Sequence, residues 1–83
     1  MTLDDLAPGT PAHIARIDWS VLADDEAKRL RALGIDTEAE VSIAHRGVLF
    51  GRDPLAVRVG VMTVALRRSH ARAITIETLA APL

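Results

Sequence analysis

The sequence contains no cysteine and only two aromatic residues, Trp19 and Phe50. Without cysteine the chain can form neither disulfide bonds nor thiolate zinc sites, and thiol catalysis is excluded. Two aromatic residues are too few for the stacking surfaces of small domains that bind nucleic acid, and too few for the aromatic grooves that bind proline-rich peptides. We therefore expect no nucleic acid partner.

Long apolar runs and catalytic motifs are also missing. No apolar run approaches the roughly 18 residues that a membrane-spanning helix needs. The opening MTLDDLAPGT places Asp4 and Asp5 where a signal peptide carries Lys or Arg, so we expect a cytoplasmic protein. The sequence has neither a GxSxG nucleophile motif nor a GxxxxGK[ST] phosphate loop. We expect a protein that is not an enzyme, with no catalytic residues and no cofactor.

The three histidines, His13, His45 and His70, lack the spacing of metal ligands. No HxxxH or HExxH motif places two of them on one helix face. We interpret all three as surface residues and expect no metal site. Direct binding of a transition metal stays open as an alternative that the spacing does not favour.

The chain has 83 residues, which makes at most one domain, placed at residues 1–83. Its charge is uneven: residues 1–40 hold nine acids and four bases (net −5), and residues 41–83 hold two acids and six bases (net +4). A basic second half favours an anionic partner. We prefer the alternative, in which the fold interleaves the two halves and their charges partly neutralise each other.

Residues 24–34 (DDEAKRLRALG) carry the clearest helix pattern. Three acids precede three bases, an order that suits the positive N-terminal end of a helix dipole. Acid-to-base pairs four residues apart, such as Asp25 with Arg29, are expected to support the helix. Gly34 stands where a helix commonly ends in a left-handed residue.

Apolar residues alternate with polar ones in several short segments, and this period of two predicts strands buried on one face. These segments are residues 11–17, 39–49, 54–59, 62–68 and 73–77. In the first, a bend or bulge is needed for Ile14 and Ile17 both to reach the core. Gly60-Val61 predicts a type II′ hairpin turn.

Two short helical turns complete the pattern. One lies in LDDLAPGT before Pro8-Gly9, and one lies at residues 68–72 before the last strand. The order predicts a mostly β fold: a small SH3-like barrel of five to six short antiparallel strands. One helix is inserted after the first strand, and residues 78–83 form a loose tail.

The sequence resembles the FeoA family, ferrous iron transport protein A, over about residues 3–77. The resemblance rests on four ordered motifs rather than on a single signature. These are Leu33-Gly34-Ile35, Gly51-Arg52-Asp53-Pro54, Leu66-Arg67-Arg68 with Ala71, and Ile74-Thr75-Ile76. Where the family usually has Pro-Gly after the first motif, this chain has Thr37-Glu38, so its turn must form without glycine.

The resemblance implies an SH3-like barrel that acts beside the large ferrous iron permease, which has a cytosolic GTP-binding domain. The implied role is regulatory protein–protein contact in iron homeostasis, with the membrane reached only through the permease. Two alternatives remain open: a regulatory SH3-like domain related to metal-dependent repressors, and a barrel that forms a homodimer through an edge strand or Met62.

Partner contact is predicted at the helix end, at the 47–53 loop and at the start of the second helical turn. The residues are Leu30, Leu33, Gly34, Ile35, Phe50, Arg52, Arg67 and Arg68. Leu30 and Leu33 are also strong core candidates. Asp53, although a carboxylate, has no catalytic or metal-ligating neighbour, and we interpret Asp53-Pro54 as the junction of a loop and a strand.

Overall fold

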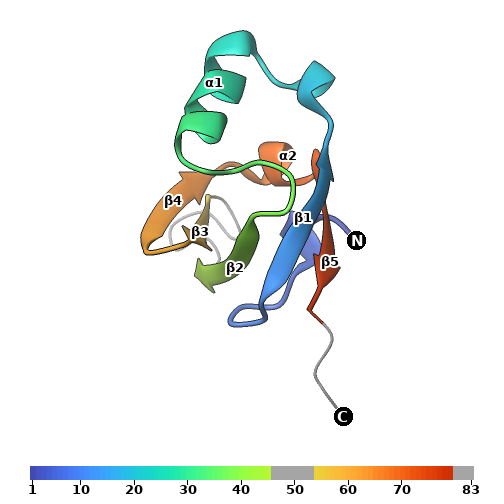
Figure 1. Ribbon diagram of the computed structural model, residues 1–83, viewed down its shortest axis with the longest axis vertical. Coiled ribbons are helices and arrows are strands. Elements are labelled where there is room, and N and C mark those ends of the chain that lie inside the picture. The colour runs from blue at the N-terminus through green and yellow to red at the C-terminus, as the bar shows by residue number, and fades with distance from the viewer. Residues whose placement is uncertain (46–53, 80–83) are drawn as a thin grey trace.

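The computed structural model describes residues 1–45 and 54–79. The fold is mostly β, as the sequence predicts, with two α-helices and two short 3₁₀ turns (Figure 1). The elements in chain order are η1 (Leu3–Asp5), β1 (Ala12–Ile17), η2 (Trp19–Val21), α1 (Asp24–Ala32), β2 (Glu40–His45), β3 (Leu55–Val59), β4 (Met62–Leu66), α2 (Arg68–Ala71) and β5 (Ile74–Thr78).

The described strands form one antiparallel sheet of five strands in the order β4-β3-β2-β1-β5. β4 and β5 therefore lie at its two edges, on opposite sides of the view in Figure 1. Among the described residues no ladder joins these edges, so the closure expected of a barrel is not present as strand pairing. Residues 78–83 were expected to form a loose tail, but Thr78 belongs to β5. Residues 80–83 of that segment lie outside the described residues.

The irregularity expected in the first strand is confirmed. The register of β1 against β5 shifts between Ile14 and Arg16, which marks a bulge at Ala15. The shift lets both Ile14 and Ile17 point into the core, where they are 0 % and 9 % exposed. A strictly alternating strand would place these two side chains on opposite faces.

The β3–β4 hairpin is also as predicted. Val59 pairs with Met62 across Gly60-Val61, and pairing continues without a shift to Leu55 with Leu66. Gly60 has a φ of 61°, whereas Val61 is not among the residues with positive φ. A single positive φ, at the first turn residue, is the signature of type II′.

Helix α1 begins at Asp24 and ends at Ala32, two residues before the predicted end. Gly34 follows in the left-handed region, with a φ of 91°, and closes the helix as expected. The ion pair predicted between Asp25 and Arg29 is wrong, because the Arg29 guanidinium instead contacts Glu26, three residues away. None of the described helices has the length and apolar character required to cross a membrane.

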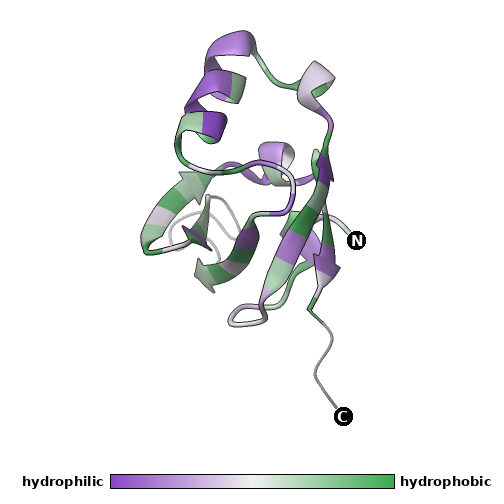
Figure 2. Ribbon diagram, in the orientation of Figure 1, coloured by the Kyte–Doolittle hydropathy of each residue, from purple (hydrophilic) through white to green (hydrophobic). Residues whose placement is uncertain are grey.

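The core lies on the inward face of the sheet and is closed by apolar residues of η1, α1 and α2. Green segments alternate with purple or pale ones along β1 and β5 in Figure 2, as the period of two predicts. The inward strand residues are Ala12, Ile14, Ile17, Val41, Ile43, Leu55, Val57, Val59, Val64, Leu66, Ile74 and Ile76. Leu3, Leu6 and Ala71 pack beside them and are at most 1 % exposed.

The preferred interpretation of the charge asymmetry is supported by contacts between the two halves. Asp4 is 8 % exposed, and its Oδ2 lies 3.4 Å from the Arg72 Nε and 3.9 Å from the Arg68 Nε. The Thr2 hydroxyl donates to the same carboxylate. An acid of the first half thereby holds α2 of the second half in place.

Candidate functional site

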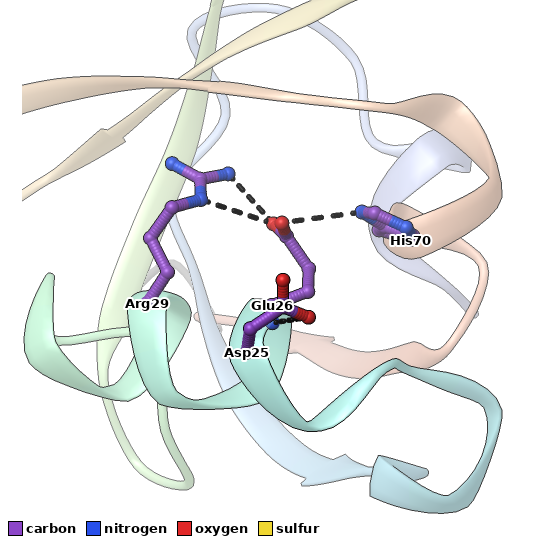
Figure 3. Close-up of polar contacts among 4 residues, drawn as sticks. All are labelled: Asp25, Glu26, Arg29 and His70. Carbon is purple, nitrogen blue, oxygen red and sulfur yellow. Dashed lines mark hydrogen bonds and ion pairs between the residues drawn. The ribbon is translucent and has the colours of Figure 1, made fainter.

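The two helices meet at the Glu26 side chain, which projects from the first turn of α1 toward α2 (Figure 3). The Arg29 guanidinium donates to Glu26 Oε1 through Nη2 at 2.7 Å and Nε at 3.2 Å. On the other side, His70 Nδ1 lies 3.7 Å from the same oxygen. Glu26 thus bridges the two helices, and we call Glu26, Arg29 and His70 the helix bridge.

Electrostatics at the helix bridge favour the ionised carboxylate. The hydrogen bonds from Arg29 lower the pKa of Glu26 below its ordinary value of 4.5, against the opposing effect of partial burial. The neighbouring His70 and Arg67 act in the same direction as Arg29. Glu26 in turn raises the pKa of the Arg29 guanidinium.

The predicted contact residues of the helix end divide between core and surface. Leu30 and Ile35 are both 0 % exposed, so their side chains belong to the core. Leu33 is half-buried against that core, and Gly34 is exposed. Leu33 and Gly34 are therefore the two residues of this segment that a partner can touch directly.

The arginines predicted at the second helical turn also differ from each other. Arg67 is exposed and precedes α2, and its carbonyl accepts hydrogen bonds from the His70 and Ala71 amides. Arg68 is half-buried beside Asp4 and helps to anchor α2. Arg67 is the freer of the two for contact with another molecule.

Two of the three predicted segments lie within the described residues, at the end of α1 and at the start of α2, and Glu26 of α1 interacts electrostatically with Arg67 before α2. The third segment, with Phe50 and Arg52, lies outside the described residues, as does Asp53. The contacts predicted for all eight residues stay predictions.

Sequence reasoning missed Glu26 and His70 as a link between helices. Nothing local in the sequence pairs these two residues. The only signal was that each lies in a predicted helical segment, Glu26 at the start of residues 24–34 and His70 within residues 68–72.

Trp19 lies on the other flank of α1, in η2. Its ring is half-buried against the core, and the Arg31 guanidinium carbon lies 4.1 Å from the ring centroid. This distance is within the range of a cation–π contact. Trp19 therefore packs the β1–α1 connection onto the domain.

Two of the histidines, His13 and His70, each face one carboxylate. His13 Nε2 lies 3.4 Å from Glu77 Oε2, and His70 faces Glu26. In residues 1–45 and 54–79 no group of three or more His, Cys, Asp or Glu side chains is arranged to hold a metal ion. Two donors are fewer than the three or four protein ligands of a zinc site.

A concave surface lies beside the end of β1, between η2 and the α2–β5 connection. It is an open hollow of about 740 Å³, lined by Arg16, Val21, Ser69, Arg72 and Thr75 among others. The lining also contains one acid, Asp18, and Arg72 contacts Asp4, so the hollow is only weakly basic. Its shape and mixed lining fit a surface for protein contact better than a site for chemistry.

Comparisons with known proteins agree with this geometry. The model of the FeoA domain matches residues 1–78. A search of curated proteins finds no match. Among solved structures, FeoA of Stenotrophomonas maltophilia, complexed with zinc and described as a prokaryotic SH3 domain protein, is 35 % identical with a TM-score of 0.76. That alignment covers 93 % of this chain and 89 % of the other.

Two solution structures are also similar. FeoA of Chlorobium tepidum is 26 % identical with a TM-score of 0.83, over 100 % of this chain and 74 % of that one. Iron(II) transport protein A of Clostridium thermocellum is 28 % identical with a TM-score of 0.81 over 95 % of this chain. This chain spans only 46 % of the Clostridium protein. Because the family model covers nearly the whole sequence, the chain belongs to the FeoA family, which is associated with ferrous iron transport.

Proposed function

We propose that this chain is a non-enzymatic accessory factor of bacterial ferrous iron uptake. It works in the cytoplasm by contact with the GTP-binding part of the iron permease. The observation that carries the proposal is the FeoA match over residues 1–78. A role as a ferrous iron transport activating factor has been put forward for the Stenotrophomonas relative, which supports the same direction.

The proposed contact surface is the face formed by the end of α1, the helix bridge and Arg67. It combines exposed charge at Arg67 and Arg29 with a half-buried apolar side chain at Leu33. Apolar contact surrounded by polar groups is the usual make-up of a protein interface. We further propose that the sheet is curved as in an SH3-like barrel and that α1 projects outward from it.

Co-purification with the cytosolic domain of the permease, with and without guanine nucleotide, tests the proposal. Wild-type protein is expected to be retained. Leu33→Ala and Arg67→Ala are expected to weaken retention roughly tenfold each, within the range of interface truncations. Arg58→Ala is the matched control, because Arg58 is equally exposed but lies on β3, outside the proposed face.

A genetic readout separates contact from function. Deleting the gene is expected to lower ferrous iron uptake while the permease is still made. Normal uptake in the deletion strain would contradict the proposed role. Retention that is unchanged in both face variants but lost in Arg58→Ala would contradict the proposed surface and leave the role standing.

A further inference from the structure

The two edge strands of the sheet, β5 and β4, differ in what lies along their outer sides. The outer edge of β5 is covered by the N-terminus: Thr2 forms a bridge with Thr75, and the Ile76 amide donates to the Met1 carbonyl at 2.9 Å. β4 pairs with β3, and in residues 1–45 and 54–79 no backbone hydrogen bond reaches β4 from its other side. Among the described residues, the edge at β5 is therefore protected, and the edge at β4, which we call the open edge, has no strand or backbone hydrogen bond on its outer side.

The open edge also lacks the features that normally prevent pairing. Sheet edges are usually protected by charged side chains, proline or a bulge. β4 reads Met-Thr-Val-Ala-Leu, with no charge and no proline, and its register against β3 has no shift. Figure 2 shows no strongly hydrophilic residue along this strand. Val61, in the turn before β4, is 96 % exposed, and Met62, the first residue of β4, is 43 % exposed.

The hairpin determines which backbone groups point outward. In a hairpin with a two-residue turn, the residues flanking the turn form a hydrogen-bonded pair, and such pairs then alternate along the ladder. With Val59 and Met62 as the first pair, the N–H and C=O groups of Thr63 and Ala65 point away from β3. Two donors and two acceptors are thus arranged along the open edge.

We propose that β4 pairs antiparallel with β4 of a second copy of this chain, around a two-fold axis at Val64. In this register Thr63 forms a hydrogen-bonded pair with Ala65 of the second copy, and the reverse pair forms by symmetry. Met62, which is 43 % exposed, then lies at the new ladder, opposite the backbone of Leu66 of the second copy. The inference is independent of the proposed role in iron uptake.

The charges favour a second copy as the occupant. The register places Arg67 opposite Val61, so no two like charges face each other across the new ladder. Arg58, the neighbour of Thr63 on β3, lies about 16 Å from its symmetry mate, three strand spacings across and two residues along, which is beyond one Debye length at physiological salt. Head-to-tail pairing of β4 with β5 is blocked, because residues 1–2 cover β5.

Sedimentation velocity over a range of concentrations, with the full chain, tests the pairing. A five-residue strand makes a small interface, so we expect a weak dimer that dissociates on dilution. In Thr63→Glu, the new carboxylate lies beside Arg58 on β3 of the same copy, which is a favourable cross-strand pair. In the dimer it also lies near the same carboxylate of the second copy, and the two like charges repel each other. We expect this substitution to weaken association on the order of tenfold. Thr63→Gln, which has the same shape without the charge, is expected to associate like the wild type.

The register itself is tested by mixing two variants. Ala65→Lys is expected to weaken self-association as Thr63→Glu does. An equimolar mixture of the two is expected to restore a dimer, because Glu at position 63 then lies opposite Lys at position 65. Hydrogen exchange gives a second readout: the Thr63 and Ala65 amides are expected to become protected as concentration rises.

A wild-type chain that stays monomeric at all concentrations would overturn the proposal. So would a dimer that Thr63→Glu leaves intact, or a mixture that does not reassociate. If the wild type is monomeric and the permease domain protects the Thr63 and Ala65 amides, the open edge accepts a strand of that partner instead, and self-pairing is wrong.

Discussion

The sheet and the helical connection between β1 and β2 are stabilised in different ways. Each strand contributes apolar side chains to one shared core, whereas α1 contributes only Ala27 and Leu30 as buried residues. The connection also buries Leu22 and Ile35. Among the described residues, α1 itself is otherwise held only by the half-buried ion pair of Glu26 with His70. Two residues with positive φ, Gly34 and Glu38, shape the turn that follows α1. Regions with few buried apolar contacts open with a lower free energy than the core. We therefore expect α1 to detach locally while the sheet stays folded.

The largest expected effect comes from removing one buried leucine in each region. Leu30 and Leu66 are both 0 % exposed. We expect Leu66→Ala, within the sheet, to lower the free energy of unfolding by about 3–4 kcal/mol, and Leu30→Ala by about 2–3 kcal/mol. The smaller cost at Leu30 follows because α1 can detach without opening the sheet. Urea denaturation measures both.

Amide hydrogen exchange provides the control for this pair. In Leu30→Ala, exchange is expected to accelerate most within α1, whereas Leu66→Ala is expected to accelerate exchange throughout the sheet. Equal acceleration in both regions for both variants would show that α1 and the sheet unfold as one unit.

A second, smaller effect is expected at the two left-handed residues of the connection. Glu38 has a φ of 68° in a turn that the Ala39 amide closes onto the Asp36 carbonyl at 3.2 Å. Glycine is preferred at this third turn position. We expect Glu38→Gly to raise the free energy of unfolding by about 0.5–1 kcal/mol, and Gly34→Ala to lower it by about 1–2 kcal/mol. Thermal denaturation measures the pair.

These two substitutions test backbone conformation rather than packing. A methyl group at Gly34 would lie 3.5 Å from Val59 Cγ1, an ordinary contact, so the expected loss comes from the positive φ. The Glu38 amide donates to the Ile14 carbonyl at 2.7 Å, and glycine preserves that bond. A loss of stability in Glu38→Gly would show that the glutamate side chain contributes more than the backbone strain costs.

The smallest effect is expected at the helix bridge. The folded-state pKa of Glu26 is lowered, so its stabilising contribution is complete above its ordinary value of 4.5 and is lost as the pH falls through the folded-state pKa. At neutral pH we expect Glu26→Gln to cost a few tenths of a kcal/mol, as is usual for surface ion pairs. Urea denaturation at several pH values measures this.

Asp24→Asn is the control for the helix bridge, because it removes a charge from the same helical turn without touching Arg29. The difference between Glu26→Gln and Asp24→Asn is expected to vanish at acidic pH, where Glu26 is protonated. A difference that persists there would assign the role of Glu26 to packing rather than charge.

Much of the fold could be predicted because its signals are local. The charge order of residues 24–32 and the glycine at 34 predict α1 and its end. Gly60-Val61 predicts the hairpin, and the spacing of Ile14 and Ile17 predicts the bulge. Each depends on neighbours within a few residues, whose conformational preferences act before any tertiary contact forms.

The sequence by itself determined the order of the strands and of α1 and α2, the inward face of each strand and membership of the FeoA family. Tertiary structure decided the rest: that Asp4 is buried against Arg72, 68 residues away, that Glu26 reaches His70, and that the N-terminus covers β5 but not β4. Such contacts depend on how segments distant in the chain come together. A period of two or 3.6 shows which side of an element is apolar, but not which element lies against it.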